Sequence, residues 1–155
     1  MTPSQLFFDL VHAMEGCRLE AYQDSAGIWT IGYGTTEYFP SGTRVAEGDT
    51  CTVEQARTYL AAHIAGLRLP DGLTQAQFDA CLDFAYNAGY GAWGSSTLKK
   101  NVVAGADGDT ITANFLVWDK AHVDGVLTEL PGLLRRRKCE AYLFVTGANH
   151  PTFFE

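Results

Sequence analysis

Apolar residues recur every three or four positions along much of the chain, and capping residues mark where the predicted helices begin. The first helix is predicted to start from a Thr2 cap, with Pro3 at its first position, and to end at Gly16. Its apolar positions are Leu6, Phe7, Leu10, Val11 and Met14.

Two later segments open with a threonine followed three residues later by a glutamine, which is the pattern of a capping box. The box at Thr52 predicts a helix over about 53–67, ended by 70–72. The box at Thr74 predicts a helix that Gly89 closes.

Three more helices are predicted downstream. Ser96 caps a short helix that reaches about Ala104. Asp109 or Thr110 opens the next, which contains Ile111, Phe115 and Trp118, and Pro131 starts a last helix that reaches about Val145.

The stretch from Ala21 to about Val45 follows a different pattern. Its segment 28–33, Ile-Trp-Thr-Ile-Gly-Tyr, is rich in β-branched and aromatic residues and lies between the turn-forming 24–27 and Gly34. This predicts a strand after a tight turn, and hence a small antiparallel sheet. With helices on both sides of it, the predicted fold class is α+β, mostly helical.

The composition is that of a folded globular chain. Of the 155 residues, 46 % are hydrophobic and 19 % charged, which excludes a disordered chain. No apolar run approaches the roughly 18 residues of a membrane span, and residues 1–5 show no feature of a secretory signal, so we expect no stable membrane insertion. The net charge of −7 argues against a nucleic-acid binder, which normally carries a positive excess.

The cysteines and histidines show no metal-ligand spacing. No metal site is therefore predicted. The four thiols are expected to be free and mostly buried, as in a cytoplasmic protein. They are Cys17, Cys51, Cys81 and Cys139.

Two carboxylates stand out because their predicted surroundings differ. Glu15 falls in the last turn of the first helix, where the negative end of the helix dipole disfavours an anion, as suits a general acid. Asp24 falls in a polar turn, where we expect it to be ionised. Two carboxyl groups in such different surroundings are typical of glycoside hydrolysis.

Each of these residues also has a purely structural interpretation. An acid near a helix end is commonly a solvated surface residue, and the aspartate of Asp-Ser-Ala-Gly commonly forms the turn. Thr30 favours a strand by propensity alone. The aromatic residues Tyr22, Trp29 and Tyr33 suit a core as well as a sugar-binding surface.

The spacing of three residues resembles the catalytic signature of the phage-type lysozymes, glycoside hydrolase family 24. Glu15 is followed after eight residues by Asp24 and after five more by Thr30, which opens Thr-Ile-Gly-Tyr-Gly-Thr. Four further segments resemble the family in the same order, so that the resemblance covers the chain from Leu6 to about Phe144. They are 53–56, 80–89, 96–100 and 130–137.

The resemblance implies a role for each matching residue. Glu15 would be the general acid that protonates the glycosidic oxygen, and Asp24 the carboxylate that positions water or stabilises the oxocarbenium-like transition state. Thr30 would hydrogen-bond that water or the Asp24 carboxylate. Arg135 aligns best with an arginine that supports the catalytic glutamate, and no cofactor or metal is implied.

The sequence departs from the usual family pattern at three places. The change at 35–36 would alter the cleft floor without removing a catalytic group, and the aromatic segment 36–40 would form a cleft lip or have no role. At 118–130 local substrate contacts would differ. The basic run 135–138 also has two interpretations outside the resemblance. It suits a solvated basic face of the last helix, or a patch that attracts anionic peptidoglycan or membrane surfaces.

The resemblance further implies one two-lobed lysozyme-like domain over 1–155. A small β lobe would span about 18–51, and a connecting helix about 53–67. The helical lobe would span about 73–146 and include the first helix. Glu15, Asp24 and Thr30 would face a substrate cleft between the lobes.

The implied activity is that of an endolysin, which hydrolyses the β-1,4 bond between N-acetylmuramic acid and N-acetylglucosamine in peptidoglycan for host cell lysis. By the same resemblance the protein would be a monomer. It would stay in the host cytoplasm until a holin gave it access to the periplasm and cell wall.

Two alternatives remain open. A muramidase-like module could serve as a protein-interaction adaptor without catalysis, which the aromatic pairs 38–39 and 153–154 would suit and the intact triad argues against. A transglycosylase would need the second carboxylate and its water to be absent, which Asp24 and Thr30 disfavour.

Overall fold

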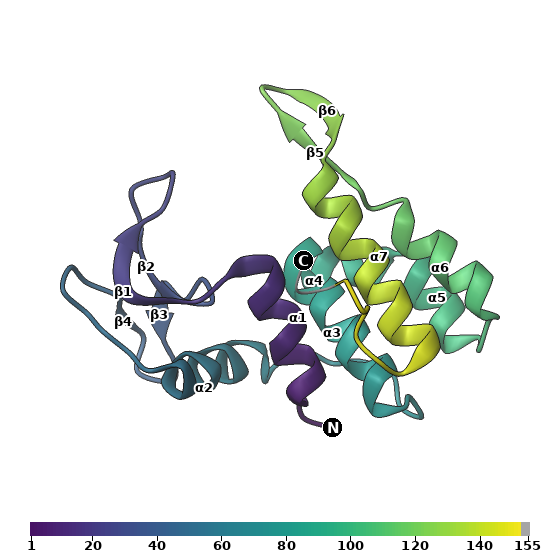
Figure 1. Cartoon of the computed structure of the whole chain (residues 1–155), viewed down its shortest axis with the longest axis horizontal. Helices are drawn as coiled ribbons and strands as arrows, with labels where there is room; N and C mark the ends of the chain where they lie inside the picture. The colour runs from purple at the N-terminus through teal and green to yellow at the C-terminus, as the bar shows by residue number, and fades with distance from the viewer. Residues whose placement is uncertain (153–155) are drawn as a thin grey trace. The chain divides into compact units, whose positions relative to one another are not determined.

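The computed structural model describes residues 1–152 and contains helices α1–α7 and strands β1–β6 in that range (Figure 1). This content confirms the predicted α+β, mostly helical class. The chain divides into two compact units. We call Val11–Gly66 the β unit, and residues 1–10 together with the chain from Leu67 onward the helical unit.

The β unit contains the predicted small antiparallel sheet. Strand β1 (Arg18–Gln23) pairs with β2 (Trp29–Gly32), and the short β3 (Glu37–Tyr38) pairs with β4 (Thr43–Arg44). The β1–β2 register is irregular between Arg18 and Tyr22. Within that stretch β1 turns its backbone to residues 49–51, since Ala21 N–H donates to Asp49 O at 2.9 Å and Cys51 N–H to Leu19 O at 2.9 Å.

Helix α2 (Val53–Ile64) completes the β unit, and its start is as predicted. The Thr52 side chain accepts from Gln55 N–H, and the Gln55 side chain accepts from Thr52 N–H. Its end differs from the prediction of about 67, because the helix stops at Ile64 with Ala65 as its C-cap. Gly66 follows directly, and glycine is among the least favourable residues for extending a helix.

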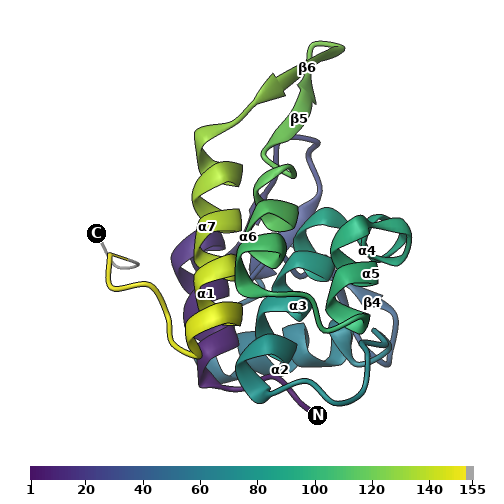
Figure 2. The same cartoon turned by 90° about the vertical axis from the view of Figure 1, so that its right-hand side faces the viewer.

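The helical unit is built around α3 (Gln75–Ala88) and α7 (Pro131–Thr146), which pack against each other. Figures 1 and 2 show α6 (Gly108–Leu116) alongside α7. The ring of Phe84 lies at the centre of its core, edge-on to Phe115 at 5.8 Å and to Trp118 at 5.3 Å between centroids.

Several helix ends in this unit confirm the sequence patterns. The Thr74 capping box is present, and Gly89, with φ of 98°, closes α3. The Ser96 hydroxyl caps α5 (Thr97–Val103), and α7 begins at Pro131.

Three expected boundaries are wrong. Helix α1 (Gln5–Glu15) begins after Ser4 rather than Thr2, because the Ser4 N–H and hydroxyl both donate to the carboxylate of Asp79. Helix α6 is capped by Asp107, whose side chain accepts from Thr110 N–H, and it ends before Trp118.

The sequence patterns also missed one helix and one hairpin of the helical unit. Helix α4 (Tyr90–Ser95) is too short to show a period. Strands β5 (Lys120–Val123) and β6 (Val126–Glu129) form a hairpin that projects beyond α6 and α7 (Figures 1 and 2). The hairpin turn places Asp124 and Gly125 at positive φ, which Asp-Gly pairs favour.

The interpretation of the basic run 135–138 as a solvated face of α7 is wrong for two of its four residues. Arg136 and Arg137 are only 3 % and 1 % exposed. Arg136 donates two hydrogen bonds to Asp83, while Arg137 donates to Glu140 at 2.6 Å and to Asn87 at 2.8 Å. Only the other two members of the run, Arg135 and Lys138, are exposed.

The buried charges of this network affect each other's protonation. Burial alone would raise the pKa of Asp83, but the charge and hydrogen bonds of Arg136 hold it below its usual range. Burial, with the negative charge of Asp83, raises the pKa of Glu140 well above its usual range although Arg137 opposes the shift. The network therefore binds a proton more readily at Glu140 than at Asp83.

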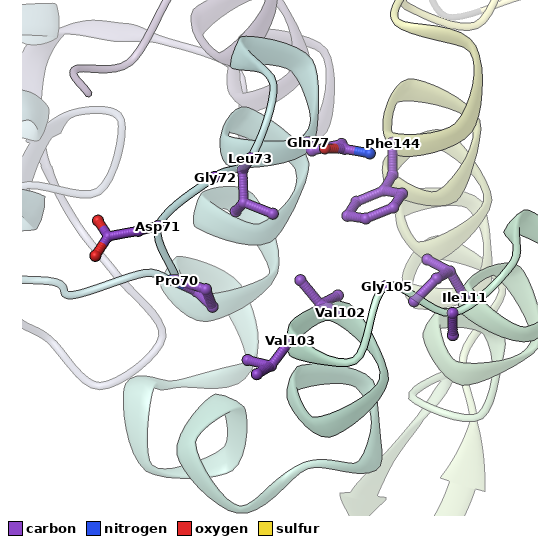
Figure 3. A pocket seen from close by; sticks show the side chains of 11 residues that line it. Pro70, Asp71, Gly72, Leu73, Gln77, Val102, Val103, Gly105, Ile111 and Phe144 are labelled. Atoms are coloured by element: carbon purple, nitrogen blue, oxygen red, sulfur yellow. The ribbon is translucent and has the colours of Figure 1, made fainter.

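The helical unit also has a partly open hollow of about 460 Å³ (Figure 3). Its apolar wall includes Leu73, Val102 and Phe144, and Asp71 lies at its edge. None of the residues singled out by the sequence pattern as catalytic lines it.

Within residues 1–152, no helix is long and apolar enough to cross a membrane. The same residues hold no cluster of three metal-binding side chains. All four cysteines are unpaired, and only Cys17 is not buried.

Candidate active site

Glu15 is the last residue of α1, where the sequence placed it. Gly16 follows with φ of 69°, a left-handed conformation that glycine adopts without strain, and its N–H donates to His12 O at 2.9 Å. The Glu15 side chain is exposed, so its carboxyl group is accessible from solvent.

Asp24 lies in the turn between β1 and β2 and organises that turn. Its Oδ1 accepts from Ala26 N–H at 2.8 Å and from Ile28 N–H at 2.9 Å. Its backbone N–H donates to Ile28 O at 2.9 Å, and its own carbonyl accepts from Gly27 N–H at 2.9 Å. The structural interpretation of Asp24 as a turn former is therefore correct.

The turn uses only one of the two Asp24 carboxylate oxygens. Among the described residues, none donates a hydrogen bond to Oδ2. The side chain is half-buried, so Oδ2 is both oriented by the turn and available for another partner. The turn therefore uses Oδ1 and leaves Oδ2 for a further partner.

Thr30 lies on β2, opposite Tyr22 of β1, and is 4 % exposed. Its hydroxyl donates to Ile28 O at 2.9 Å rather than to the Asp24 carboxylate. The hydroxyl oxygen keeps its lone pairs, so toward a water molecule it would act as an acceptor.

The structure links two of the three predicted catalytic residues through Ile28. Ile28 donates its N–H to Asp24 and accepts the hydroxyl of Thr30 through its carbonyl. Glu15 enters the same unit from α1, three residues before β1 begins at Arg18. Arg135 belongs to the helical unit, and its support of Glu15 stays a prediction.

Sequence reasoning missed a polar cluster around the buried hydroxyl of Tyr33. The hydroxyl hydrogen-bonds to the side chains of His12, Cys17 and Arg57. The spacing of these four residues carried no recognisable pattern. The sequence offered only Tyr33 itself as a clue, because it follows a largely apolar strand and a buried tyrosine hydroxyl needs a polar partner.

Comparison with known sequences decides the family. The family model described as phage lysozyme matches residues 12–140, a range that includes Glu15, Asp24 and Thr30. The chain belongs to the phage lysozyme family. This confirms the resemblance seen in the sequence.

Individual relatives of this phage lysozyme family member agree with that assignment. The chain is 40 % identical over 141 residues to an endolysin of Acyrthosiphon pisum secondary endosymbiont phage 1, covering 87 % of this chain and 92 % of the relative. It is 37 % identical over 145 residues to the endolysin of Salmonella phage P22, covering 85 % and 90 %.

The fold agrees as well. The solved structure of an endolysin from Escherichia coli O157:H7 phage FAHEc1 has a TM-score of 0.86 and 35 % sequence identity, and the match covers 97 % of both chains. As a phage lysozyme, the protein is a glycoside hydrolase of the muramidase type, and its function is lytic hydrolysis of peptidoglycan.

Proposed function

We propose that Glu15, Asp24 and Thr30 together cleave the β-1,4 bond between N-acetylmuramic acid and N-acetylglucosamine. The observation that carries this proposal is that the turn binds one carboxylate oxygen of Asp24 and leaves the other open. Two backbone N–H groups hold its Oδ1, so Oδ2 has a set direction before substrate arrives. A preorganised charge of this kind lowers a transition state because it needs no reorganisation during the reaction.

Each residue takes one step of the reaction. Glu15 gives its proton to the glycosidic oxygen as the bond from that oxygen to the anomeric carbon breaks, and the leaving sugar departs as an alcohol. The electron-poor anomeric carbon is stabilised by the negative charge of Asp24. A water molecule adds to that carbon, and the water's second proton passes to a carboxylate.

Thr30 contributes orientation rather than charge. Because its hydroxyl hydrogen is held by Ile28 O, its oxygen is left to accept a hydrogen bond from the attacking water. Accepting that bond leaves a lone pair of the water directed at the sugar. This supports the water-binding alternative for Thr30 over a direct bond to Asp24.

The test is Glu15→Gln, which is nearly isosteric and removes the proton donor. The rate of clearing of outer-membrane-permeabilised Gram-negative cells should fall by about 10²-fold or more, the usual contribution of a general acid. Glu47→Gln, an exposed carboxylate of the same unit, is the matched control and should retain the parental rate. Parental activity in Glu15→Gln would remove Glu15 from the mechanism.

Mass analysis of the released fragments identifies the reaction. Hydrolysis leaves reducing-end muramic acid, and a transglycosylase leaves anhydro ends. Absence of activity in the parent protein would instead favour the adaptor alternative.

We propose a supporting role for Arg135 from the family resemblance alone. Arg135→Ala should lower the clearing rate several-fold, whereas Lys138→Ala, an exposed cation on the same helix, should not. Equal clearing rates for the two variants would show that Arg135, like Lys138, does not support the reaction.

We also propose that the protein acts as a monomer and reaches the wall from the host cytoplasm through a holin lesion. Size-exclusion chromatography with light scattering tests the first part. Expression in a bacterial host with and without a co-expressed holin tests the second, since lysis should need both proteins. Lysis without a holin would overturn the access route.

A further inference from the structure

Tyr33 is a buried tyrosine whose hydroxyl joins three segments of the β unit. Its side chain is 1 % exposed. The hydroxyl shares a hydrogen bond of 3.3 Å with His12 Nδ1 on α1 and further hydrogen bonds with the side chains of Cys17 and Arg57. A phenol has one donor and two acceptor sites, so one hydroxyl can serve three partners.

The position of these partners along the chain brings Tyr33 close to the catalytic machinery. His12 precedes Glu15 by three residues, which places the two on neighbouring positions of α1. Cys17 follows Glu15 by two residues, in the link to β1. The Tyr33 hydroxyl therefore holds the chain on both sides of Glu15.

Tyr33 is itself fixed against α2. It lies in a turn over residues 31–35, whose ends exchange two backbone hydrogen bonds of 2.8 and 2.9 Å. Gly32 has φ of 64°, and a Cβ added there would lie 2.9 Å from Ala56 Cβ. The turn thus packs directly on the helix that supplies Arg57.

The hydroxyl is also chemically suited to a permanent structural bond. Burial raises the pKa of the Tyr33 phenol although Arg57 opposes the shift, and burial likewise raises the pKa of the Cys17 thiol. Both groups are therefore neutral in the neutral pH range, so the contact between Tyr33 and Cys17 joins two uncharged side chains.

We propose that Tyr33 is a positioning residue for the catalytic acid, an inference that rests on the proposed role of Glu15. Its hydroxyl fixes the backbone of 12–17 relative to the strand that carries Thr30. Placement of this kind matters because a misplacement of about 1 Å can reduce a rate on the order of 100-fold. Tyr33 acts through Glu15 and does not touch the reacting atoms.

The test is Tyr33→Phe, which removes one oxygen and keeps the ring. We expect the maximal rate on purified peptidoglycan to fall at least tenfold, while the half-saturating peptidoglycan concentration changes less than twofold. The backbone amide signals of Glu15 and Gly16 should shift in ¹H–¹⁵N spectra. A role confined to stability would lower the melting temperature without these two changes.

Tyr90→Phe is the matched control. Tyr90 belongs to the helical unit, and its hydroxyl also donates one hydrogen bond, to Arg68 O at 3.0 Å. Its loss should leave the maximal rate within twofold of the parent.

The outcomes separate this inference from the proposed function. If Glu15→Gln is inactive and folded Tyr33→Phe has the parental maximal rate, the positioning role is overturned and the role of Glu15 stands. If Glu15→Gln retains the parental rate, both proposals fail. Should Tyr33→Phe not fold, the double variant His12→Ala, Cys17→Ala removes both partners of the hydroxyl on the Glu15 segment, and an unchanged maximal rate in it would equally overturn the positioning role.

Discussion

The guanidinium group of Arg136 donates to the carboxylate of Asp83 through two parallel hydrogen bonds, from Nε to Oδ2 at 2.8 Å and from Nη2 to Oδ1 at 2.7 Å. Both side chains are almost completely buried. This pair ties α7 to α3 at the centre of the helical unit, and a charge left alone there would have no water to solvate it.

Breaking the pair should therefore cost far more than removing a surface charge. Arg136→Ala should lower the free energy of unfolding by about 3–5 kcal/mol, because Asp83 is left buried without its main partner. Lys138→Ala, on the same helix but exposed, should change it by less than about 0.5 kcal/mol. Urea unfolding of both variants measures the contrast, and similar small losses would mean that water solvates Asp83.

The raised pKa of Glu140 predicts how stability depends on pH. The folded protein holds the Glu140 proton to a higher pH than the unfolded chain does. Between the ordinary value of 4.5 and the raised value, the folded state binds more protons, so this group's contribution to stability falls as pH rises.

Glu140→Gln should remove that contribution. Melting temperatures measured from pH 5 to pH 8 should decline less with rising pH in Glu140→Gln than in the parent. The difference between the two curves isolates Glu140 from the other titrating groups. Parallel curves would show that Arg137 keeps Glu140 ionised across this range.

The turn uses only one carboxylate oxygen of Asp24, so two different substitutions of this residue should affect activity and stability differently. Asp24→Asn keeps an acceptor oxygen for the N–H groups of Ala26 and Ile28 and should melt close to the parent, but it loses the negative charge and most of the activity. Asp24→Ala loses both functions and should also unfold about 1–2 kcal/mol more easily. Equal melting of the two variants would mean that the turn does not depend on the side chain.

Because β2 lies close to α2 at Gly32, replacing this glycine with alanine should cost more stability than replacing a glycine with open space around it. Gly32→Ala combines a positive φ with a Cβ only 2.9 Å from Ala56 Cβ, and should cost about 2–4 kcal/mol. Gly48→Ala, with φ of 85° and no atom within 4 Å of the added Cβ, should cost only about 1–2 kcal/mol. Thermal unfolding compares them, and equal losses would show that α2 yields to the added methyl group.

Features encoded by neighbouring residues were predictable from the sequence. The capping boxes at Thr52 and Thr74 need only residues three positions apart, and both are present. The turn at Asp24 needs only the two N–H groups that follow it within four residues. Local hydrogen bonding decides such features, so the local sequence is sufficient.

Features that depend on distant residues were not predictable in this way. The first helix starts at Gln5 because Asp79, 75 residues from Ser4, takes the Ser4 donors. Arg136 is buried because Asp83, 53 residues away, lies opposite it. A run of four basic residues contains no information about which of them will meet a carboxylate.

In the candidate site, too, some features were predictable from the sequence and others were not. Spacing along the chain and family resemblance identified Glu15, Asp24 and Thr30 as candidates. The dependence of their segment on Tyr33 arises only when α1, β2 and α2 come together, since its partners lie 21 residues before it on α1 and on the later helix α2.

The turn that aims Asp24 uses main-chain atoms almost exclusively. Ala26 contributes only its N–H, and Ile28 contributes its N–H and carbonyl while its side chain remains 44 % exposed. Evolution is thus free to change the side chains at 25, 26 and 28 without redirecting the carboxylate. Substitutions at these positions would therefore change the outer surface of the turn and leave in place the backbone N–H groups that hold Asp24 Oδ1.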